Sequence, residues 1–304
     1  MYNFCSITSV NYIYQTLALT NCLKNEKYNI LCLDKDSYDF FLKKNFKKVR
    51  VFSLDDLNYQ KNLNDIRINR SYLDFIFTLK PIFLYFIFKK LIKNSKIIYL
   101  DSDIYFFGDV KYLKKNLKNY SIFLTEHNFS WRNKDKKKYG LYNAGFIAFN
   151  KDSFGTKALE WWKKSCVKKC SFKVTRYHFT DQKYLDQFSK KFKRVFIMNK
   201  NIFNIAPWNI DNLISTNNSH KNIRINFFHF QGLKFITNNI FQLGLSDYHL
   251  SKKGKSYLDE FYSFYCLRIQ NIIKKYQIPN TINFYTRFKV FIKALFRNDL
   301  FFIK

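Results

Sequence analysis

Short apolar runs alternate with segments that are apolar on one helical face in the first part of the chain. Apolar runs of this length, bounded by polar residues, are typical of buried strands. They lie at residues 3–10, 28–34 and 47–54, and the segments between them, 11–25 and 36–46, are predicted helices. This alternation predicts an α/β domain with a mostly parallel sheet and flanking helices.

The run "KIIYL" at residues 96–100 is apolar after its lysine, as expected for a central strand covered on both faces. Before it, residues 71–94 have a helical pattern but contain Pro81, so they predict a kinked helix or two helices. The carboxyl end of the strand delivers Asp101 and Asp103, one residue apart. Two carboxylates that repel each other at the end of a buried strand require either solvent or a cation.

The same pattern continues to about position 230. Further strands are predicted at residues 121–127, 143–150, 194–198 and 223–230, and a helix is predicted at 154–169. A second helix is predicted at 180–192, where Thr180 or Asp181 is placed to cap the first turn.

The character of the sequence changes near residues 247–254, where we place a boundary between a first domain, 1–250, and a helical C-terminal extension, 251–304. Within the extension, residues 255–277 predict a long helix ended by Pro279, and residues 281–304 predict an amphipathic helix. Its apolar face carries Phe284, Phe288, Phe291, Ile292 and Leu295, and its cationic face carries Arg287, Lys289, Lys293 and Arg297.

Composition and charge describe a folded, strongly basic chain. It has 304 residues, 47% of them hydrophobic, and only seven Gly and three Pro, which excludes a disordered or low-complexity protein. The formal net charge of +31 is spread over nearly every segment and accompanies a general excess of Lys, Asn, Ile, Phe and Tyr. Such uniform enrichment argues against dedicated nucleic-acid binding, although it favours anionic partners such as nucleoside diphosphates or an acidic lipid surface.

The N-terminal segment has no basic region followed by an uninterrupted apolar run, so no signal peptide is predicted. The longest apolar run, residues 81–88, is too short to span a bilayer. The six cysteines are then expected to be reduced thiols, and the spacing of Cys166 and Cys170 suggests packed or surface thiols rather than a zinc site. We expect a cytoplasmic protein.

The pair Asp101 and Asp103 has three interpretations. The first is a solvated turn, the second is the motif of a haloacid-dehalogenase-type phosphatase, and the third is a site for a divalent cation that binds a diphosphate. A position outside the carboxyl end of a central strand favours a ligand site over a turn. The phosphatase interpretation is disfavoured because a long stretch of chain, 1–100, precedes the pair. The chain also lacks the later acidic motif G-D-x-x-x-D.

Five stretches along the chain carry a combined signal: "LKP" (79–81), "IIYLDSDIYFF" (97–107), "YNAGFIAFN" (142–150), "TDQKYLDQF" (180–188) and "FFHFQGLK" (227–234). Taken together, they resemble stretches of GT-A-fold nucleotide-sugar glycosyltransferases, similar to family eight, the glycogenin and lipopolysaccharide-galactosyltransferase group. They follow the family's order and cover roughly three-quarters of the chain. The resemblance implies that residues 1–250 form a GT-A catalytic domain.

The resemblance also implies a metal site for Mn²⁺ or Mg²⁺. Asp101 and Asp103 match its D-x-D motif, and His229 matches the histidine that supplies the third ligand. The predicted strand at 223–230 runs into His-Phe-Gln-Gly and turns at Gly232, which would leave the imidazole of His229 able to coordinate a cation.

Further positions match residues that bind the nucleotide sugar. Asn143 and Gly145 match the N-A-G segment, Lys80 matches a basic residue near the nucleotide, and Lys234 matches a lysine on the donor diphosphate. Asp181 and Gln182 match a D-Q pair with catalytic roles, in which Asp holds sugar hydroxyls and Gln lies near the anomeric carbon. The remaining expected donor contacts are Thr8, Ser9, Asn11, Ser102 and Gly232.

Two positions depart from the family pattern. The loop "TSVNY" lacks the family's usual aspartate, and Lys234 is followed by "FI" rather than Pro-Trp. On the acceptor side, "NIAPWNI" (204–210) resembles bacterial relatives and makes Trp208 either a platform for a sugar ring or a core residue.

The resemblance predicts retaining transfer of a hexose from a UDP-sugar to a glycan or lipid-linked acceptor. The alternative is a non-enzymatic basic protein that binds RNA or an anionic membrane surface. The amphipathic segment 281–297 leaves two further options open, docking on the catalytic domain or peripheral attachment to the inner face of a membrane.

Overall fold

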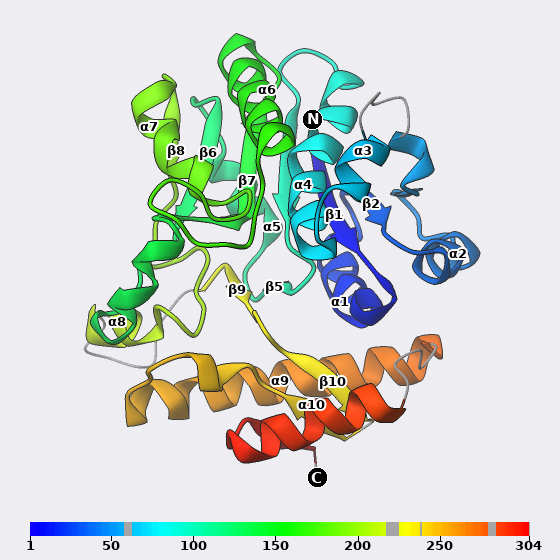
Figure 1. Cartoon of the computed structure of the whole chain (residues 1–304), viewed down its shortest axis with the longest axis vertical. Coiled ribbons are helices and arrows are strands. Elements are labelled where there is room, and N and C mark those ends of the chain that lie inside the picture. The colour runs from blue at the N-terminus through cyan, green and yellow to red at the C-terminus, as the bar shows by residue number, and fades with distance from the viewer. Residues whose placement is uncertain (58–62, 217–224, 238, 279–283, 304) are drawn as a thin grey trace.

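The computed structural model describes residues 1–57, 63–216, 225–237, 239–278 and 284–303 (Figure 1). Its centre is a seven-stranded sheet with the strand order β3-β2-β1-β4-β7-β6-β8. The strands are β1 (Tyr2–Thr8), β2 (Lys27–Cys32), β3 (Val49–Phe52), β4 (Lys96–Leu100), β6 (Ile122–Glu126), β7 (Tyr142–Asn150) and β8 (Val195–Ile197). Within this sheet β7 alone runs antiparallel to its neighbours, so the predicted α/β fold with a mostly parallel sheet is confirmed.

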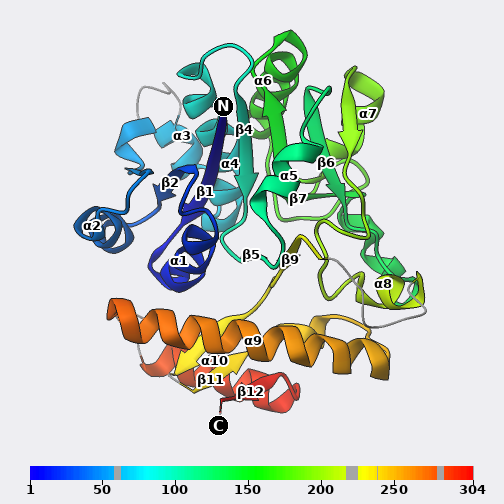
Figure 2. The ribbon, with the colours of Figure 1, turned by 180° about the vertical axis from the view of Figure 1, so that it is seen from behind.

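Helices cover both faces of the sheet. The helices of this part of the chain are α1 (Ile13–Cys22), α2 (Lys35–Lys44), α3 (Leu63–Ile68), α4 (Tyr72–Lys89), α5 (Val110–Asn116), α6 (Ser153–Lys168), α7 (Phe188–Lys191) and α8 (Ile210–Thr216). In β4, Ile97 and Tyr99 join the core beneath α4 and α6, whereas Ile98 and Leu100 join the core beneath α1 and α5 (Figures 1 and 2). This two-sided burial explains why the strand is apolar throughout.

Two helical predictions are settled by the structure. α4 is one helix that contains Pro81, so the two-helix interpretation of residues 71–94 is wrong. The helix predicted at 180–192 is wrong in its first half, because it begins with a short 3-10 helix, η4 (Lys183–Gln187), and only then continues as α7. Thr180 has φ +47°, so it is not in the extended conformation of an N-cap residue.

A second, two-stranded sheet extends from the end of β4. It pairs β5 (Ile104–Phe106) antiparallel with β9 (Phe227–His229), and the sequence pattern did not predict β5. The predicted strand 223–230 is therefore shorter where it is described, and residues 223–224 lie outside the described residues. The pairing matters because it brings His229 beside the turn that follows β4.

The C-terminal part of the chain contains helices and a small sheet. The helices are α9 (Lys252–Tyr276) and α10 (Phe284–Phe296), and the sheet contains β10 (Lys234–Thr237), β11 (Ile240–Gln242) and β12 (Leu300–Phe302). Both helices lie together at the end of the molecule away from the N-terminus, below β5 and β9 (Figures 1 and 2). α9 packs against α1, and β12 pairs with β11, so core contacts and a strand pair join the extension to the domain that precedes it.

The two helical predictions for the extension are only partly matched. α9 ends at Tyr276 with Gln277 in the left-handed conformation, while the predicted helix breaker Pro279 lies outside the described residues. On α10, Phe288 and Leu295 of the predicted apolar face are exposed, and Phe291 and Ile292 are half-buried. No described helix is long and apolar enough to cross a bilayer.

Asp299 fixes the last strand in place. Its carboxylate is buried and accepts hydrogen bonds from the main-chain N–H groups of Gly244 (3.0 Å) and Leu245 (2.8 Å) and from the side chain of Gln242 (3.2 Å). A buried acceptor with this many donors holds together two segments that are far apart in sequence.

Replacing Asp299 by Ala should lower the free energy of unfolding by about 2–3 kcal/mol, because the donors would remain buried without an acceptor. Asp299→Asn keeps one acceptor oxygen and should lose less. Urea denaturation measures both, and equal stability of Asp299→Ala and the unmodified chain would contradict the assigned role.

Candidate functional site

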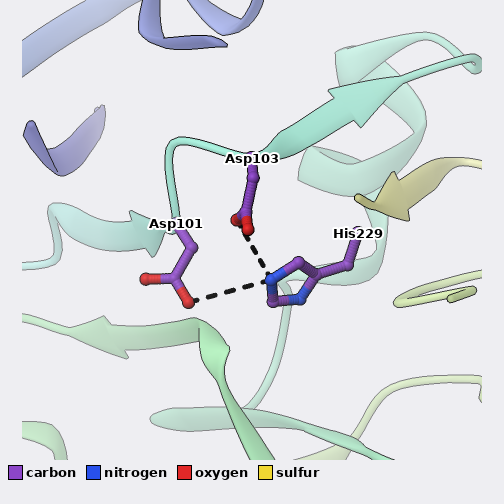
Figure 3. Close-up of side chains that lie close together, drawn as sticks. All are labelled: Asp101, Asp103 and His229. Carbon is purple, nitrogen blue, oxygen red and sulfur yellow. Dashed lines mark ion pairs between the residues drawn. The ribbon is translucent and has the colours of Figure 1, made fainter. Parts of the chain in front are cut away.

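Asp101, Asp103 and His229 converge at the carboxyl end of β4 (Figure 3). The Nε2 atom of His229 lies 3.0 Å from Oδ1 of Asp103 and 4.0 Å from Oδ2 of Asp101. One possible ligand atom from each of the three residues lies within 4.8 Å of the other two. Among the described residues this is the group of His, Cys, Asp and Glu side chains arranged to hold a cation.

Main-chain hydrogen bonds fix the backbone that carries the three side chains. The N–H of Asp101 donates to the carbonyl of Gly145 on β7 (2.8 Å), and the N–H of Phe230 donates to the carbonyl of Asp103 (2.9 Å). Opposite Ile104, His229 closes the β5–β9 pair. The turn between β4 and β5 is therefore held from both sides, which preorganises the carboxylates before any ligand binds.

Charge in this group is partly balanced without a cation. Burial lowers the pKa of His229, but the carboxylates of Asp103 and Asp101 outweigh it and hold the pKa above the ordinary value of 6.5. Burial likewise raises the pKa of Asp103, yet the neighbouring His229 holds it below its ordinary value. His229 would therefore have to lose a proton in order to hold a cation.

The donor set suits a divalent cation. Two carboxylate oxygens favour Mg²⁺ or Mn²⁺, and an imidazole nitrogen favours the transition metal of these two. The Nδ1 atom of His229 is buried without a hydrogen-bond partner among the described residues, whereas Nε2 faces both carboxylates, so Nε2 is the nitrogen placed to bind a cation. The residues present thus fit the cation that the sequence predicted.

Lys80 connects Asp101 to Asp181. Its Nζ atom lies 3.2 Å from Oδ1 of Asp101 and 3.4 Å from Oδ2 of Asp181, and donates to the carbonyl of Ala144 at 3.0 Å. Burial lowers the pKa of Lys80, but these two carboxylates outweigh it and raise the pKa. Lys80 is therefore not a lysine on a solvated helix face, and Asp181 faces Lys80 instead of capping a helix.

Asn143 and Gln182 meet beside this ion-pair network. Oε1 of Gln182 accepts hydrogen bonds from the N–H of Ala144 (3.2 Å) and from Nδ2 of Asn143 (3.4 Å), while its Nε2 donates to the carbonyl of Tyr139 (3.1 Å). Oδ1 of Asn143 accepts from the N–H of Gly145. The N-A-G and D-Q motifs, which are separate in sequence, thus form one hydrogen-bonded unit.

Gly145 allows the closest approach in the site. A Cβ atom at this position would lie 2.5 Å from Cε1 of His229, 2.6 Å from Oδ1 of Asn143 and 2.9 Å from Oδ2 of Asp101. These distances are shorter than van der Waals contact, so only glycine leaves room for the three side chains. Glycine at this position of the N-A-G segment therefore has a direct structural reason.

The residues expected at the end of β1 divide into buried and exposed ones. Thr8 is buried, and its hydroxyl lies 2.7 Å from that of Thr16, which donates to Ser102. Ser102 is also buried and donates to the carbonyl of Ile7. Both hydroxyls therefore serve the β1–β4 connection, whereas Ser9 is half-buried and Asn11 is exposed.

Asp34, at the end of β2, was not predicted to take part in this loop. Its Oδ2 accepts from the N–H of Val10 (2.9 Å), and its Oδ1 caps α2 through the N–H of Ser37. A carboxylate thus reaches the loop that lacks an aspartate of its own. Its position at the carboxyl end of the predicted strand 28–34 was the available sequence signal.

The remaining predicted positions follow β9 or pack behind it. Gly232 has φ +86°, which confirms the predicted turn, and Lys234 begins β10 with an exposed side chain. Trp208 is 1% exposed, and its ring packs edge-on against His229 at 5.3 Å between centroids. The interpretation of Trp208 as a platform for a sugar ring is not supported, because other side chains cover its ring. The ring packs against His229 instead.

His127, which follows β6 at the same edge of the sheet, was not among the predicted site residues. Its Nε2 lies 3.1 Å from Nδ2 of Asn143, and its ring stacks on Phe129 and packs edge-on against Trp208. Burial lowers the pKa of His127 to about 3, so the imidazole is neutral and accepts the hydrogen bond from Asn143.

Acid should destabilise the fold through His127. Its pKa is about 6.5 in an unfolded chain and about 3 in the folded chain. Its contribution to stability is therefore complete above pH 6.5 and lost as pH falls toward 3, by up to about 1.4 kcal/mol per pH unit. His127→Gln keeps an acceptor but does not titrate. Urea denaturation at pH 7.5 and pH 5 should show the unmodified chain losing stability relative to the variant, and a pH-independent difference would contradict this.

Comparisons with other proteins give partial similarity. No protein-family model matches the chain. It is 29% identical over 217 residues to the protein YfnF of Bacillus subtilis (strain 168). The matched region covers 68% of this chain and 71% of YfnF. It is 24% identical over 254 residues to YfnD of the same organism, covering 80% of this chain and 81% of YfnD. Among solved structures, the apo form of mouse xyloside xylosyltransferase 1 is similar with 13% identity and a TM-score of 0.47, over 76% of this chain and 98% of that one.

Proposed function

We propose that this chain is a metal-dependent glycosyltransferase that moves a hexose from a nucleoside-diphosphate sugar to a glycan or lipid-linked acceptor. The observation that carries the proposal is the convergence of Asp101, Asp103 and His229 outside the carboxyl end of a central strand. Ligands of open α/β sheets bind at this position. The five motifs that resemble family-eight glycosyltransferases support a UDP-sugar as the donor.

Asp101, Asp103 and His229 would hold Mn²⁺ or Mg²⁺, with the imidazole favouring Mn²⁺. When bound, such a cation neutralises the donor diphosphate and stabilises the negative charge of the leaving nucleoside diphosphate. Lys80 adds a buried positive charge 3.2 Å from Asp101. It therefore holds Asp101 in the orientation in which its other oxygen faces His229.

On the sugar side, Asp181 is a buried carboxylate whose movement Lys80 limits, and we assign it to accepting hydrogen bonds from sugar hydroxyls. Gln182 contributes indirectly, because its amide oxygen already accepts two hydrogen bonds. We assign it to positioning Asn143 and the start of β7. Retention of anomeric configuration is part of the proposal through the family resemblance. The acceptor oxygen would bond to the anomeric carbon on the face from which the nucleoside diphosphate leaves, and the acceptor proton would pass to the departing diphosphate, so no protein nucleophile is needed.

The test is a donor-turnover assay on the unmodified chain. A panel of nucleoside-diphosphate sugars is incubated with Mn²⁺, and release of nucleoside diphosphate is measured with and without EDTA. The proposal expects release from at least one donor, lost with EDTA and restored by added Mn²⁺. Absence of metal-dependent release and of donor binding across the panel would contradict it.

We also propose a cytoplasmic location with peripheral attachment to an anionic membrane through α10. Phe296 is 84% exposed on this helix, and Leu295 beside it is about half exposed. Removing α10 and the residues after it is a poor test of this attachment, because the truncation also removes β12 and Asp299. Phe296→Ser should instead reduce cosedimentation with phosphatidylglycerol vesicles, and unchanged cosedimentation would count against attachment through α10.

A further inference from the structure

Two segments beside the candidate site form one exposed surface, which we call the basic rim: residues 131–139, the 3-10 helix η3, and residues 172–179. The rings of Tyr139 and Phe179 pack at 4.8 Å. Lys183 joins the two segments, because its Nζ donates to the carbonyls of Lys138 (2.7 Å) and Thr175 (2.8 Å). The two segments are therefore held together although they are far apart in sequence.

The basic rim is connected to the site by two routes. On one side, Nε2 of Gln182 donates to the carbonyl of Tyr139 within the rim. On the other, Nζ of Lys136 lies 5.5 Å from the ring centroid of Tyr248. The Tyr248 ring lies 6.1 Å from that of Trp208, which packs against His229. A molecule bound on the rim therefore lies next to the residues proposed to hold the donor.

The composition of the rim differs from that of the rest of the chain. Its one acidic residue is Asp135, and its basic residues are Arg132, Lys134, Lys136, Lys137, Lys138, Lys173 and Arg176. This share of Lys and Arg is more than twice that of the whole chain. Aromatic side chains are exposed among the cations, with Trp131 68% and Tyr177 65% exposed. Arg132 lies over the Trp131 ring at 4.4 Å.

From these observations we infer that the basic rim binds the acceptor, and that the acceptor is an acidic glycan chain. The inference rests on the proposed function. Exposed indole and phenol rings pack against the apolar faces of sugar rings, and neighbouring Lys and Arg side chains pair with carboxylate or phosphate groups on the same chain. The aromatic residues alternate with cations instead of forming a continuous apolar stripe, which favours a glycan over a lipid bilayer.

The test must separate the rim from the general positive charge of the protein. One variant changes three exposed rim residues, Lys134→Gln, Lys137→Gln and Lys138→Gln. The matched control changes Lys35, Lys43 and Lys47 to Gln, which are exposed on or just after α2. Both variants lose the same charge. The probes are oligogalacturonate, a neutral dextran oligomer of equal length, a short single-stranded RNA and phosphatidylglycerol vesicles, with binding measured at two salt concentrations.

The rim variant should bind oligogalacturonate about tenfold more weakly than the unmodified chain, while the control changes less than about twofold. Trp131→Ala should also weaken this binding without any change in charge. Equal effects of the rim and control variants would overturn the inference. The inference would also be overturned if the rim bound dextran, RNA or vesicles more tightly than oligogalacturonate. Metal-dependent donor turnover is measured separately, so its absence would reject the proposed function whichever way the glycan binds.

Discussion

Asp103→Asn is expected to abolish metal binding and donor turnover together. The substitution removes one of two carboxylates and replaces it with an isosteric amide, so the cation loses an anionic ligand while the shape of the site is kept. It also removes the negative charge that lies 3.0 Å from Nε2 of His229. We expect Mn²⁺ affinity to fall at least about 100-fold and donor turnover about 100- to 1,000-fold.

Isothermal titration with Mn²⁺ and nucleotide release measure the two effects. Asp39→Asn is the matched control, because Asp39 is exposed on α2, outside the group of candidate ligands. Circular dichroism establishes that both variants are folded. Full turnover in Asp103→Asn would refute the role of this residue, and loss of turnover with Mn²⁺ affinity intact would move its role away from the metal.

Gly145→Ala is expected to lower both stability and donor turnover, because the added methyl group would enter the site from β7. The added methyl group would lie closest to His229 and Asn143, and neither side chain can move away without breaking its own contacts. Overpacking of this kind costs about 1–3 kcal/mol of stability. Donor turnover should fall with it, because the displaced atoms belong to the proposed metal and sugar sites.

A double variant separates the clash from a general effect on β7. In a chain that carries His229→Ala, the nearest clashing atom is absent, so Gly145→Ala should then cost less stability than it does alone. Thermal and urea unfolding of the unmodified chain, both single variants and the double variant give the coupling energy. An equal cost in both backgrounds would show that the clash with His229 is not the reason for glycine at this position.

Much of the fold was predictable because its signals are local. Most strands of the central sheet carry apolar residues over several positions, and turn or cap residues bound them. The position of Asp101 and Asp103 followed from β4, whose burial on both faces fixes where the chain leaves the core. These features depend on residues that are close together in the chain.

What the sequence did not reveal depends on contacts between distant segments. β5 is short, and it becomes a strand because β9, from a much later part of the chain, pairs with it. The same holds for β12, which pairs with β11 across the whole length of α9 and α10. Short strands of this kind have no periodicity of their own to detect.

Contacts between distant segments also decide the parts of the site that the sequence did not predict. Lys80 lies in an apolar helix, and its buried position is tolerated because Asp101 and Asp181 come to it from two other segments. That pairing also turns Asp181 away from the helix end that it was predicted to cap. The role of Trp208 was not predictable for the same reason, because only the folded structure packs its ring against His229 and His127.

The central claim is that Asp101, Asp103 and His229 together bind one divalent cation. Pulsed electron paramagnetic resonance of Mn²⁺ added to the chain tests this directly, because it detects nitrogen bound to the ion. We predict one tightly bound Mn²⁺ per chain, with a ¹⁴N coupling that is replaced by a ¹⁵N coupling after labelling of histidine with ¹⁵N and is lost in His229→Ala. A bound Mn²⁺ with oxygen ligands alone, or no tightly bound Mn²⁺, would contradict the claim.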